Sequence, residues 1–177
     1  MKWVLFTGTW RLTNAEVERD VRSAVRDVIG RGDGVLTGGA PGVDYFAMDE
    51  TLKLNPNGSH LRVIIPAQLK NYIDVHYAGC CTPPITKDDI ANLASLLSRL
   101  KEVNPASLLE MPYDIITQAH YHLRNDQEVM YSNEVYVFQV NGSAGAQYTV
   151  DKSVEANLPI TLHKKYKIEE PTEEALK

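Results

Sequence analysis

Short apolar runs alternate with amphipathic stretches along the first part of the chain. Runs at 3–9, 34–37 and 61–66 are rich in β-branched and other apolar residues, which predicts three buried strands. Between these runs, apolar positions recur every three or four residues, which predicts two helices. The order strand, helix, strand, helix, strand indicates a parallel sheet with right-handed crossovers.

Capping and turn residues mark the ends of these two helices. Thr13 and Glu16 match a capping box, in which the hydroxyl accepts from the third helical amide and the glutamate reaches back. Gly30 and Gly32 follow the last apolar position of this helix and predict its end. The turn-forming segment 55–58, with a proline and a glycine, ends the second helix.

The middle of the chain has a less regular pattern. Residues 68–78 are predicted to form either a short helix or an irregular loop. A helix is predicted to begin near Thr86, with apolar residues on one face. Because prolines bracket the surrounding segment, we expect residues 83–112 to form a helical insertion over the sheet rather than part of it.

Another helix is predicted to begin at Pro112 and to run toward Met130. Its inward-facing positions are expected to be Ile115, Ile116, Ala119 and Leu123. A fourth strand is predicted over 134–140, and a helix over about 147–156 follows it. Asn157 is expected to end that helix in the left-handed conformation.

A fifth strand is predicted over 158–162, and the charged remainder from His163 to Lys177 is expected to be an exposed tail or a partner-docking segment. We divide the chain into one domain over 1–165 and a charged tail over 166–177. The predicted fold class is therefore α/β, a three-layer sandwich with a mainly parallel sheet.

The bulk properties are those of an ordinary globular protein. The chain has 177 residues, 44% hydrophobic residues and a mean hydropathy of −0.27, which suit a single domain with a sizeable core. The net charge of −5 makes nucleic acid an unexpected partner, although a local basic patch is compatible with it. No apolar run reaches a membrane span, and no signal peptide is recognised, so a cytoplasmic location is expected.

Residues that bind metals or act as nucleophiles form no recognisable pattern. Cys80 and Cys81 are adjacent rather than spaced as zinc ligands, and we expect two reduced thiols near a loop, with a vicinal disulfide as the rarer alternative. His120 and His122 are two residues apart on a helix and therefore diverge. The sequence predicts neither a metal site nor a cofactor.

Two glycine-rich loops each follow a β-branched run and precede a helix. Glycine lets backbone amides approach a phosphate closely, and the N-terminus of a helix favours an anion. A third polar segment follows the first strand. All three segments fall at the carboxyl ends of predicted parallel strands, where open sheets bind their ligands. The candidate ligand-binding residues in them are Gly8, Thr9, Arg11, Gly38, Gly39, Gly42, Asp44, Gly142, Ser143 and Gly145.

Three further polar positions have two interpretations each. Asp44 either caps the helix that follows it or faces a ribose hydroxyl. Arg124 is a candidate cationic ligand contact, but an arginine near a helix end also interacts favourably with the helix dipole. The same ambiguity applies to Asn125. The residues alone leave these alternatives open.

The segment from Val35 to Asp44 resembles the G-G-A-x-G-x-D signature of the SLOG superfamily, which includes the DNA-processing protein DprA, the LOG enzymes and the YpsA/YspA-like proteins. Residues 6–10 resemble its first strand with the G-S/T-R motif, and residues 141–146 resemble its G-G-x-G-T loop. Pro66-Ala67 and Arg124-Asn125 resemble segments of the YspA-like branch. The matched segments occur in order over 3–162, with 83–112 omitted.

The resemblance implies a Rossmann-like fold that binds a nucleotide or a nucleotide-derived ligand, such as a nucleoside monophosphate or an ADP-ribose-like molecule. It also implies that Arg124 belongs to the site and that the protein forms a homodimer. LOG enzymes carry a catalytic glutamate in P-G-G-x-G-T-x-x-E, and Thr149 stands at that position here. The motif's threonine is replaced by Ala146, while Trp10 and Pro41 replace arginines that are frequent in the family.

Three hypotheses about function follow from these patterns. The leading one is a nucleotide-binding protein, with a role as a sensor. The first alternative is an N-glycosidic-bond hydrolase of the LOG phosphoribohydrolase type, which would need Asp44 or Asp126 to supply the missing carboxylate. The second alternative is single-stranded DNA binding of the DprA kind, which the net charge disfavours.

Overall fold

A computed structural model describes residues 1–79 and 84–170, so Cys80 and Cys81 lie outside the described residues. Six strands form one sheet in the order β4-β3-β2-β1-β5-β6, and each neighbouring pair is parallel. This arrangement confirms the predicted α/β, Rossmann-like fold. The strands are β1 (Trp3–Gly8), β2 (Gly34–Thr37), β3 (Leu61–Ile65), β4 (Leu108–Glu110), β5 (Glu134–Val140) and β6 (Ile160–Tyr166).

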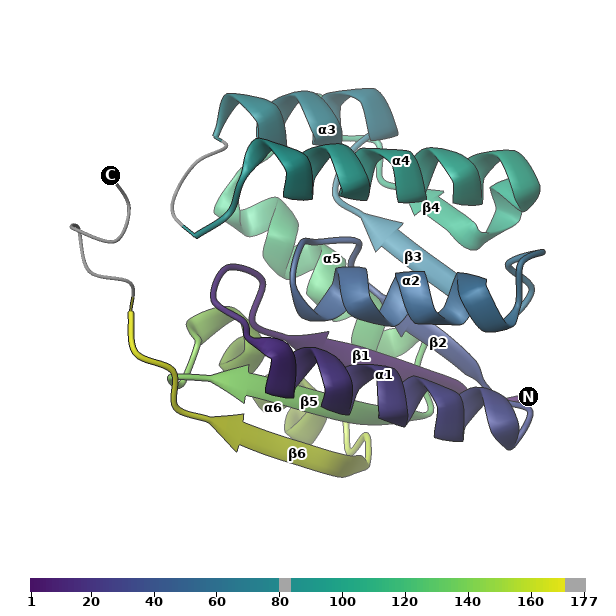
Figure 1. The fold of residues 1–177 in the computed structure, drawn as a ribbon, viewed down its shortest axis with the longest axis vertical. Coiled ribbons are helices and arrows are strands. Elements are labelled where there is room, and N and C mark those ends of the chain that lie inside the picture. The colour runs from purple at the N-terminus through teal and green to yellow at the C-terminus, as the bar shows by residue number, and fades with distance from the viewer. Residues whose placement is uncertain (80–83, 171–177) are drawn as a thin grey trace.

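Helices cover both faces of this sheet (Figure 1). In the described ranges, every helix is too short or too polar to cross a bilayer. The helices are α1 (Ala15–Gly30), α2 (Val43–Leu54), α3 (Leu69–Ala78), α4 (Lys87–Val103), α5 (Gln118–Met130) and α6 (Ala144–Glu155).

Alternate residues of the strands supply two hydrophobic cores. Val4 and Phe6 of β1 pack into the core under α1, α2 and α4, whereas Leu5 joins the core on the side of α5 and α6. Successive side chains of a strand point to opposite faces, so a strand covered on both sides must be apolar throughout. The continuous apolar runs of the sequence therefore reflect burial on both faces.

The predicted capping residues of the first two helices are wrong by one or two positions. Asn14, in an extended conformation, caps α1, and its side-chain oxygen accepts from the amides of Glu16 and Val17 at 3.1 and 3.0 Å. The N-cap of α2 is Gly42, whose φ of 71° favours glycine, so Asp44 lies inside the first turn instead of capping the helix.

The prediction that 83–112 lies entirely outside the sheet is also wrong. Leu108–Glu110 forms β4, which pairs with β3 through Val63 and Leu108, Ile64 and Leu109, and Ile65 and Glu110. A strand of three residues is too short to show a period in the sequence. The rest of the segment contains α4, and residues 69–78 adopt the helical alternative as α3.

Two further boundaries differ from the predictions. α5 begins at Gln118 rather than Pro112, and Ile115 is 75% exposed instead of facing inward. Leu123 is also exposed, because the buried side of α5 carries the polar residues Arg124 and Glu128. β6 continues to Tyr166, so residues that were expected to begin the tail belong to the sheet. Asn157 has a φ of 54° and confirms the predicted left-handed end of α6.

Candidate functional site

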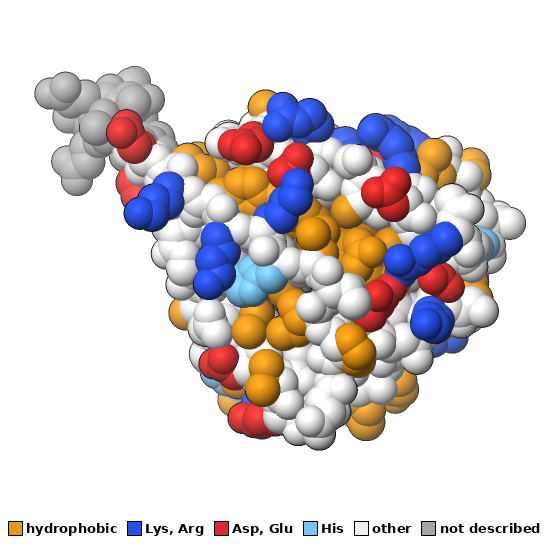
Figure 2. Space-filling view, turned by 90° about the horizontal axis from the view of Figure 1, so that it is seen from below, with side chains coloured by type: hydrophobic (Ala, Val, Ile, Leu, Met, Phe, Trp, Pro, Cys, Tyr) orange, Lys and Arg blue, Asp and Glu red, His pale blue; other side chains and the backbone are white. Residues whose placement is uncertain are grey.

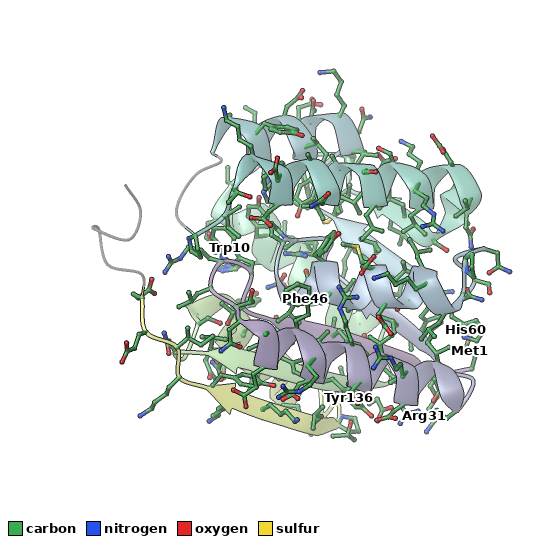
Figure 3. The ribbon with its side chains drawn as sticks, in the orientation of Figure 1. Met1, Trp10, Arg31, Phe46, His60 and Tyr136 are labelled. Atoms are coloured by element: carbon green, nitrogen blue, oxygen red, sulfur yellow. The ribbon has the colours of Figure 1, made fainter. Side chains whose placement is uncertain are left out.

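The candidate site lies where the direction of strand order reverses, between β1 and β5. These neighbours pair from Val4 and Glu134 to Gly8 and Phe138, and the following helices α1 and α6 cover opposite faces of the sheet. In doubly wound sheets such a divergence opens a crevice at the carboxyl ends of the strands. A cavity of about 630 Å³ occupies this position. Trp10 lies at the same edge, far from His60 at the opposite edge (Figure 3).

Thr9 ties the end of β1 to the loop after β5. Its amide donates to the carbonyl of Phe138 at 3.2 Å, and its hydroxyl accepts from the amide of Val140 at 2.9 Å. The same hydroxyl donates to Ser143 Oγ at 3.1 Å. Thr9 and Ser143 therefore form a fixed polar pair on the cavity wall. Gly8 is needed here for close packing, because an added Cβ would lie 2.4 Å from the Phe138 carbonyl oxygen.

The glycines of the first glycine loop make room for other parts of the chain. A Cβ on Gly38 would lie 1.2 Å from Arg124 Nη1, and one on Gly39 would lie 2.8 Å from the side chains of Val63 and Ile65. At Gly42 it would lie 2.6 Å from the Thr9 carbonyl oxygen. The structure brings these glycines to the predicted edge, but none of the three lines the cavity.

A buried ion cluster fills the space beside this loop. Arg124 Nη1 lies 3.3 Å from Glu128 Oε1 and 3.8 Å from Asp44 Oδ2. All three side chains are buried and line the cavity. Asp44 also accepts from the Ala40 amide at 3.1 Å, which closes the glycine loop on itself. The charge of the arginine is therefore already balanced by protein carboxyl groups.

Burial dominates the titration of this cluster. It raises the pKa of Glu128 to about 8, against the opposing attraction of Arg124, and it also raises the pKa of Asp44. The pKa of Arg124 is nevertheless raised, because Glu128 and Asp44 outweigh the effect of burial. Burial thus makes the Glu128 carboxyl harder to ionise than an exposed glutamate, while the arginine stays charged.

Aromatic and histidine side chains from α3 and α5 extend this wall. The Tyr72 hydroxyl donates to the Gly39 carbonyl at 3.1 Å, and its ring packs edge-on against His76 at 4.5 Å. His76 Nε2 is buried without a hydrogen-bond partner among the described residues, and burial lowers the pKa of this histidine to about 4. Tyr121 lies against Arg124, with the guanidinium carbon 5.8 Å from the ring centre.

The second glycine loop opens directly into the cavity. Ser143 is the N-cap of α6, but its side chain makes no capping hydrogen bond, and the first turn holds no acidic residue. Gly145 lines the cavity, and an added Cβ there would meet no atom within 4 Å. Gly142 has a φ of 65° and lines a separate surface groove. The amides of a first helical turn have no partner within the helix, so this end of α6 favours a bound anion.

The structure brings most of the predicted site residues to one cavity. Asn125 and Arg124 lie on the same face of α5 as Tyr121 and Glu128, which follows from their helical spacing. Residues of the predicted set that line the cavity are Gly8, Thr9, Arg11, Asp44, Arg124, Asn125, Ser143 and Gly145. The predicted residues outside its wall are Gly38, Gly39, Gly42 and Gly142.

Residues that the sequence analysis did not select also line the cavity. Glu128 could have been recognised, because it lies four residues after Arg124 and therefore on the same helical face. Tyr72 and His76 lie on α3, a segment whose sequence is compatible with either a helix or a loop. Glu170 comes from the predicted tail, and no local pattern indicates its position.

The position of the LOG-type glutamate gives no support for that chemistry. Thr149 is buried, its hydroxyl donates to the Gly145 carbonyl at 3.4 Å, and it does not line the cavity. Asp126, one of two carboxylates considered as a replacement, accepts from the Tyr148 hydroxyl at 2.9 Å and lies outside the cavity wall. Of the two, only Asp44 reaches the cavity. Within 1–79 and 84–170, no three potential metal ligands cluster together.

The sequence matches no protein-family model and no curated protein. Comparison of structures gives a clear result. DNA processing protein A from Helicobacter pylori, described for its single-stranded DNA binding mode, superposes with a TM-score of 0.63 and 16% identity, over 97% of this chain and 67% of that one. The fold is DprA-like.

Two more solved structures share this fold. DprA from Streptococcus pneumoniae gives a TM-score of 0.57 and 15% identity over 99% of this chain, which spans about half of that protein, 53%. The structural-genomics target TM1055 gives 0.54 and 12% identity over 90% of this chain and 72% of that one. Similarity at this level of identity shows the Rossmann-like fold alone, and function has to be inferred from the site.

Proposed function

We propose that the chain binds a nucleotide or a nucleotide-derived ligand in the cavity at the C-terminal edge of the sheet. The observation that carries this proposal is the N-terminus of α6, which opens into the cavity without a side-chain cap or an acidic first turn. A terminus of this kind attracts a phosphate group. A nucleoside monophosphate and an ADP-ribose-like molecule are the two ligand types, in keeping with a YspA-like member of the SLOG superfamily.

The remaining wall of the cavity suits the rest of such a ligand. Its volume of about 630 Å³ lies within the range of small-molecule sites. Asn125 offers an amide for the polar edge of a base. Apolar and aromatic side chains offer a surface for the base itself, and they include Leu12, Tyr72, Val75, Ile90 and Tyr121.

The two glycine loops differ in the groups that they offer to a phosphate. The α6 amides and the hydroxyls of Thr9 and Ser143 lie together on the cavity wall. Arg124, by contrast, is already paired with Asp44 and Glu128. We therefore assign the phosphate to α6, and we assign a supporting role to the glycines of the first loop.

Substitution of Ser143 tests the phosphate position. Aspartate and asparagine both cap helices well, so neither Ser143→Asp nor Ser143→Asn should lower the stability of the unliganded protein. Only the aspartate places a negative charge where the phosphate would bind. AMP and ADP-ribose, added separately in a thermal-shift assay, should raise the melting temperature of the wild type and of Ser143→Asn but not of Ser143→Asp.

Two results would contradict the proposal. One is the absence of a shift with AMP, ADP-ribose and a wider panel of nucleotides. The other is an equal shift for the aspartate and asparagine variants, which would place the anion elsewhere. Mass spectrometry of small molecules that copurify with the native protein provides an independent readout of the ligand class.

Hydrolysis of an N-glycosidic bond is a second candidate function, because two buried carboxyl groups line the cavity. A protonated Glu128 could donate a proton to a leaving base, and an ionised Asp44 could stabilise positive charge on the sugar. Chromatography of nucleoside monophosphates after incubation with the protein would detect free base. Binding without release of base would exclude this activity for the nucleotides tested.

The Helicobacter pylori protein is described as binding single-stranded DNA. For this chain we favour that function less than nucleotide binding. The net charge is −5, and basic and acidic side chains are interspersed on the face that Figure 2 shows. Proteins that bind single strands without sequence preference use a positively charged groove. We expect no gel shift with single-stranded DNA at low salt, and a salt-sensitive shift would reverse this preference.

The family resemblance also implies a homodimer, and light scattering of the purified protein would test this oligomeric state.

A further inference from the structure

After β6 the chain turns along the strand-end edge of the sheet, as the yellow segment in Figure 1 shows. Asn141, the first residue of the second glycine loop, holds this segment. Its amide donates to the Tyr166 carbonyl at 3.0 Å, while its side chain donates to the Ile168 carbonyl at 2.7 Å and accepts from the Ile168 amide at 3.1 Å. The segment is therefore attached to the loop that leads into α6.

Glu170 continues this segment into the cavity. Both of its carboxylate oxygens accept from Arg11 Nη2, at 2.6 and 2.9 Å. Arg11 and Glu170 both line the cavity into which the N-terminus of α6 opens. A carboxylate of the protein is thus paired with a cation that lines the same cavity as the proposed phosphate site.

We propose that residues 166–170 act as an intramolecular competitor of the ligand, in which the Glu170 carboxylate occupies Arg11 until an oxyanion of the ligand replaces it. This inference rests on the proposed function and adds a regulated anion subsite to it. The ligand class that it selects carries a phosphate or carboxylate group within reach of Arg11. The Asn141 contacts keep the competing carboxylate close after each displacement, which raises its effective concentration.

The exposure of the ion pair makes it displaceable. The side chains of Arg11 and Glu170 are 29% and 55% exposed, and ion pairs of this kind contribute little to stability. A phosphate carries more negative charge than a carboxylate and forms stronger charge-assisted hydrogen bonds with arginine. Removal of the competing charge should therefore tighten binding of an anionic ligand by roughly two- to fivefold.

Glu170→Gln in the full chain, with Glu169→Gln as its matched control, tests the competition. AMP and adenosine are the probes, with affinities measured by isothermal titration calorimetry. Glu170→Gln should bind AMP roughly two- to fivefold more tightly than the wild type does. Glu169→Gln should bind AMP like the wild type, and adenosine, which lacks the phosphate, should bind all three proteins equally.

Arg11→Gln distinguishes direct competition from a general change of charge. In this background, Glu170→Gln should no longer change the affinity for AMP, because the contested cation is gone. A gain of the same size with Arg11→Gln present, or with Glu169→Gln, would overturn the inference. If the wild type binds AMP and Glu170→Gln binds it with the same affinity, the competition is overturned while the proposed function stands. No binding of AMP, ADP-ribose or a wider panel of nucleotides to any of the proteins would contradict the proposed function and the competition together.

Discussion

Gly38→Ala is the substitution that most directly tests the ion cluster. The new Cβ would lie 1.2 Å from Arg124 Nη1, 2.4 Å from Arg124 Cζ and 2.6 Å from Glu128 Oε1. The φ of Gly38 lies outside the left-handed region, so alanine meets no backbone strain there. The methyl group must therefore act by displacing the guanidinium from its position between the two carboxyl groups.

The expected loss follows from the burial of this cluster. Breaking a buried ion pair by removing one partner costs about 3–5 kcal/mol, because the remaining charge loses its compensation. Asp44 and Glu128 would both lose the compensating charge of Arg124, although Glu128 can avoid an unpaired charge by staying protonated. For a chain of this size, such a loss corresponds to a fall in melting temperature of roughly 6–20 °C.

Urea unfolding monitored by circular dichroism measures this loss. Gly30→Ala is the control, because a Cβ there meets no atom within 4 Å and alanine favours the helix by up to about 1 kcal/mol. Arg124→Gln should make Gly38→Ala less costly than in the wild type, since the guanidinium that lies closest to the new methyl group is gone and only the contact with Glu128 remains. A loss below about 1 kcal/mol, or additive effects in this double-mutant cycle, would refute the reasoning.

Two buried titratable groups should give the stability opposite dependences on pH. Burial raises the pKa of Glu128 from 4.5 to about 8, so its contribution is complete below pH 4.5 and is lost as the pH rises toward 8; Glu128→Gln should remove this slope, of up to about 1.4 kcal/mol per pH unit. Burial lowers the pKa of His76 from 6.5 to about 4, so stability is complete above pH 6.5 and falls toward pH 4; His76→Gln should flatten that limb. Urea unfolding between pH 4 and 9 measures both slopes, and unchanged slopes in the variants would contradict these assignments.

The strands could be predicted from sequence where burial on both faces makes them continuously apolar. β1, β2, β3 and β5 satisfy this condition and were all predicted. β4 was missed, because a strand of three residues shows no period. β6 was predicted as the strand over 158–162, but its exposed lysines hid its continuation to Tyr166. The predicted start of α5 was early because a proline can precede a helix without beginning it.

The location of the site was more predictable than the roles of its residues. Glycine after a strand identifies the edge, because each strand ends there. What fills the space beside Gly38 is Arg124, from a distant part of the chain, and no local pattern reveals that contact. The same holds for Glu170, which reaches Arg11 only because the chain folds back after β6.

The two glycine loops differ in the carboxylate that accompanies each of them. The first turn of α2 contains Asp44, which accepts from the Ala40 amide and lies beside Arg124 in a buried position. The first turn of α6 contains no acidic residue, and the carboxylate of Glu170, which lines the same cavity, is 55% exposed. A buried carboxylate is costly to displace, whereas an exposed one contributes about 1 kcal/mol or less. An anionic ligand would therefore meet a buried carboxylate at α2 and a displaceable competitor at α6, so we infer that binding at the second loop can be regulated.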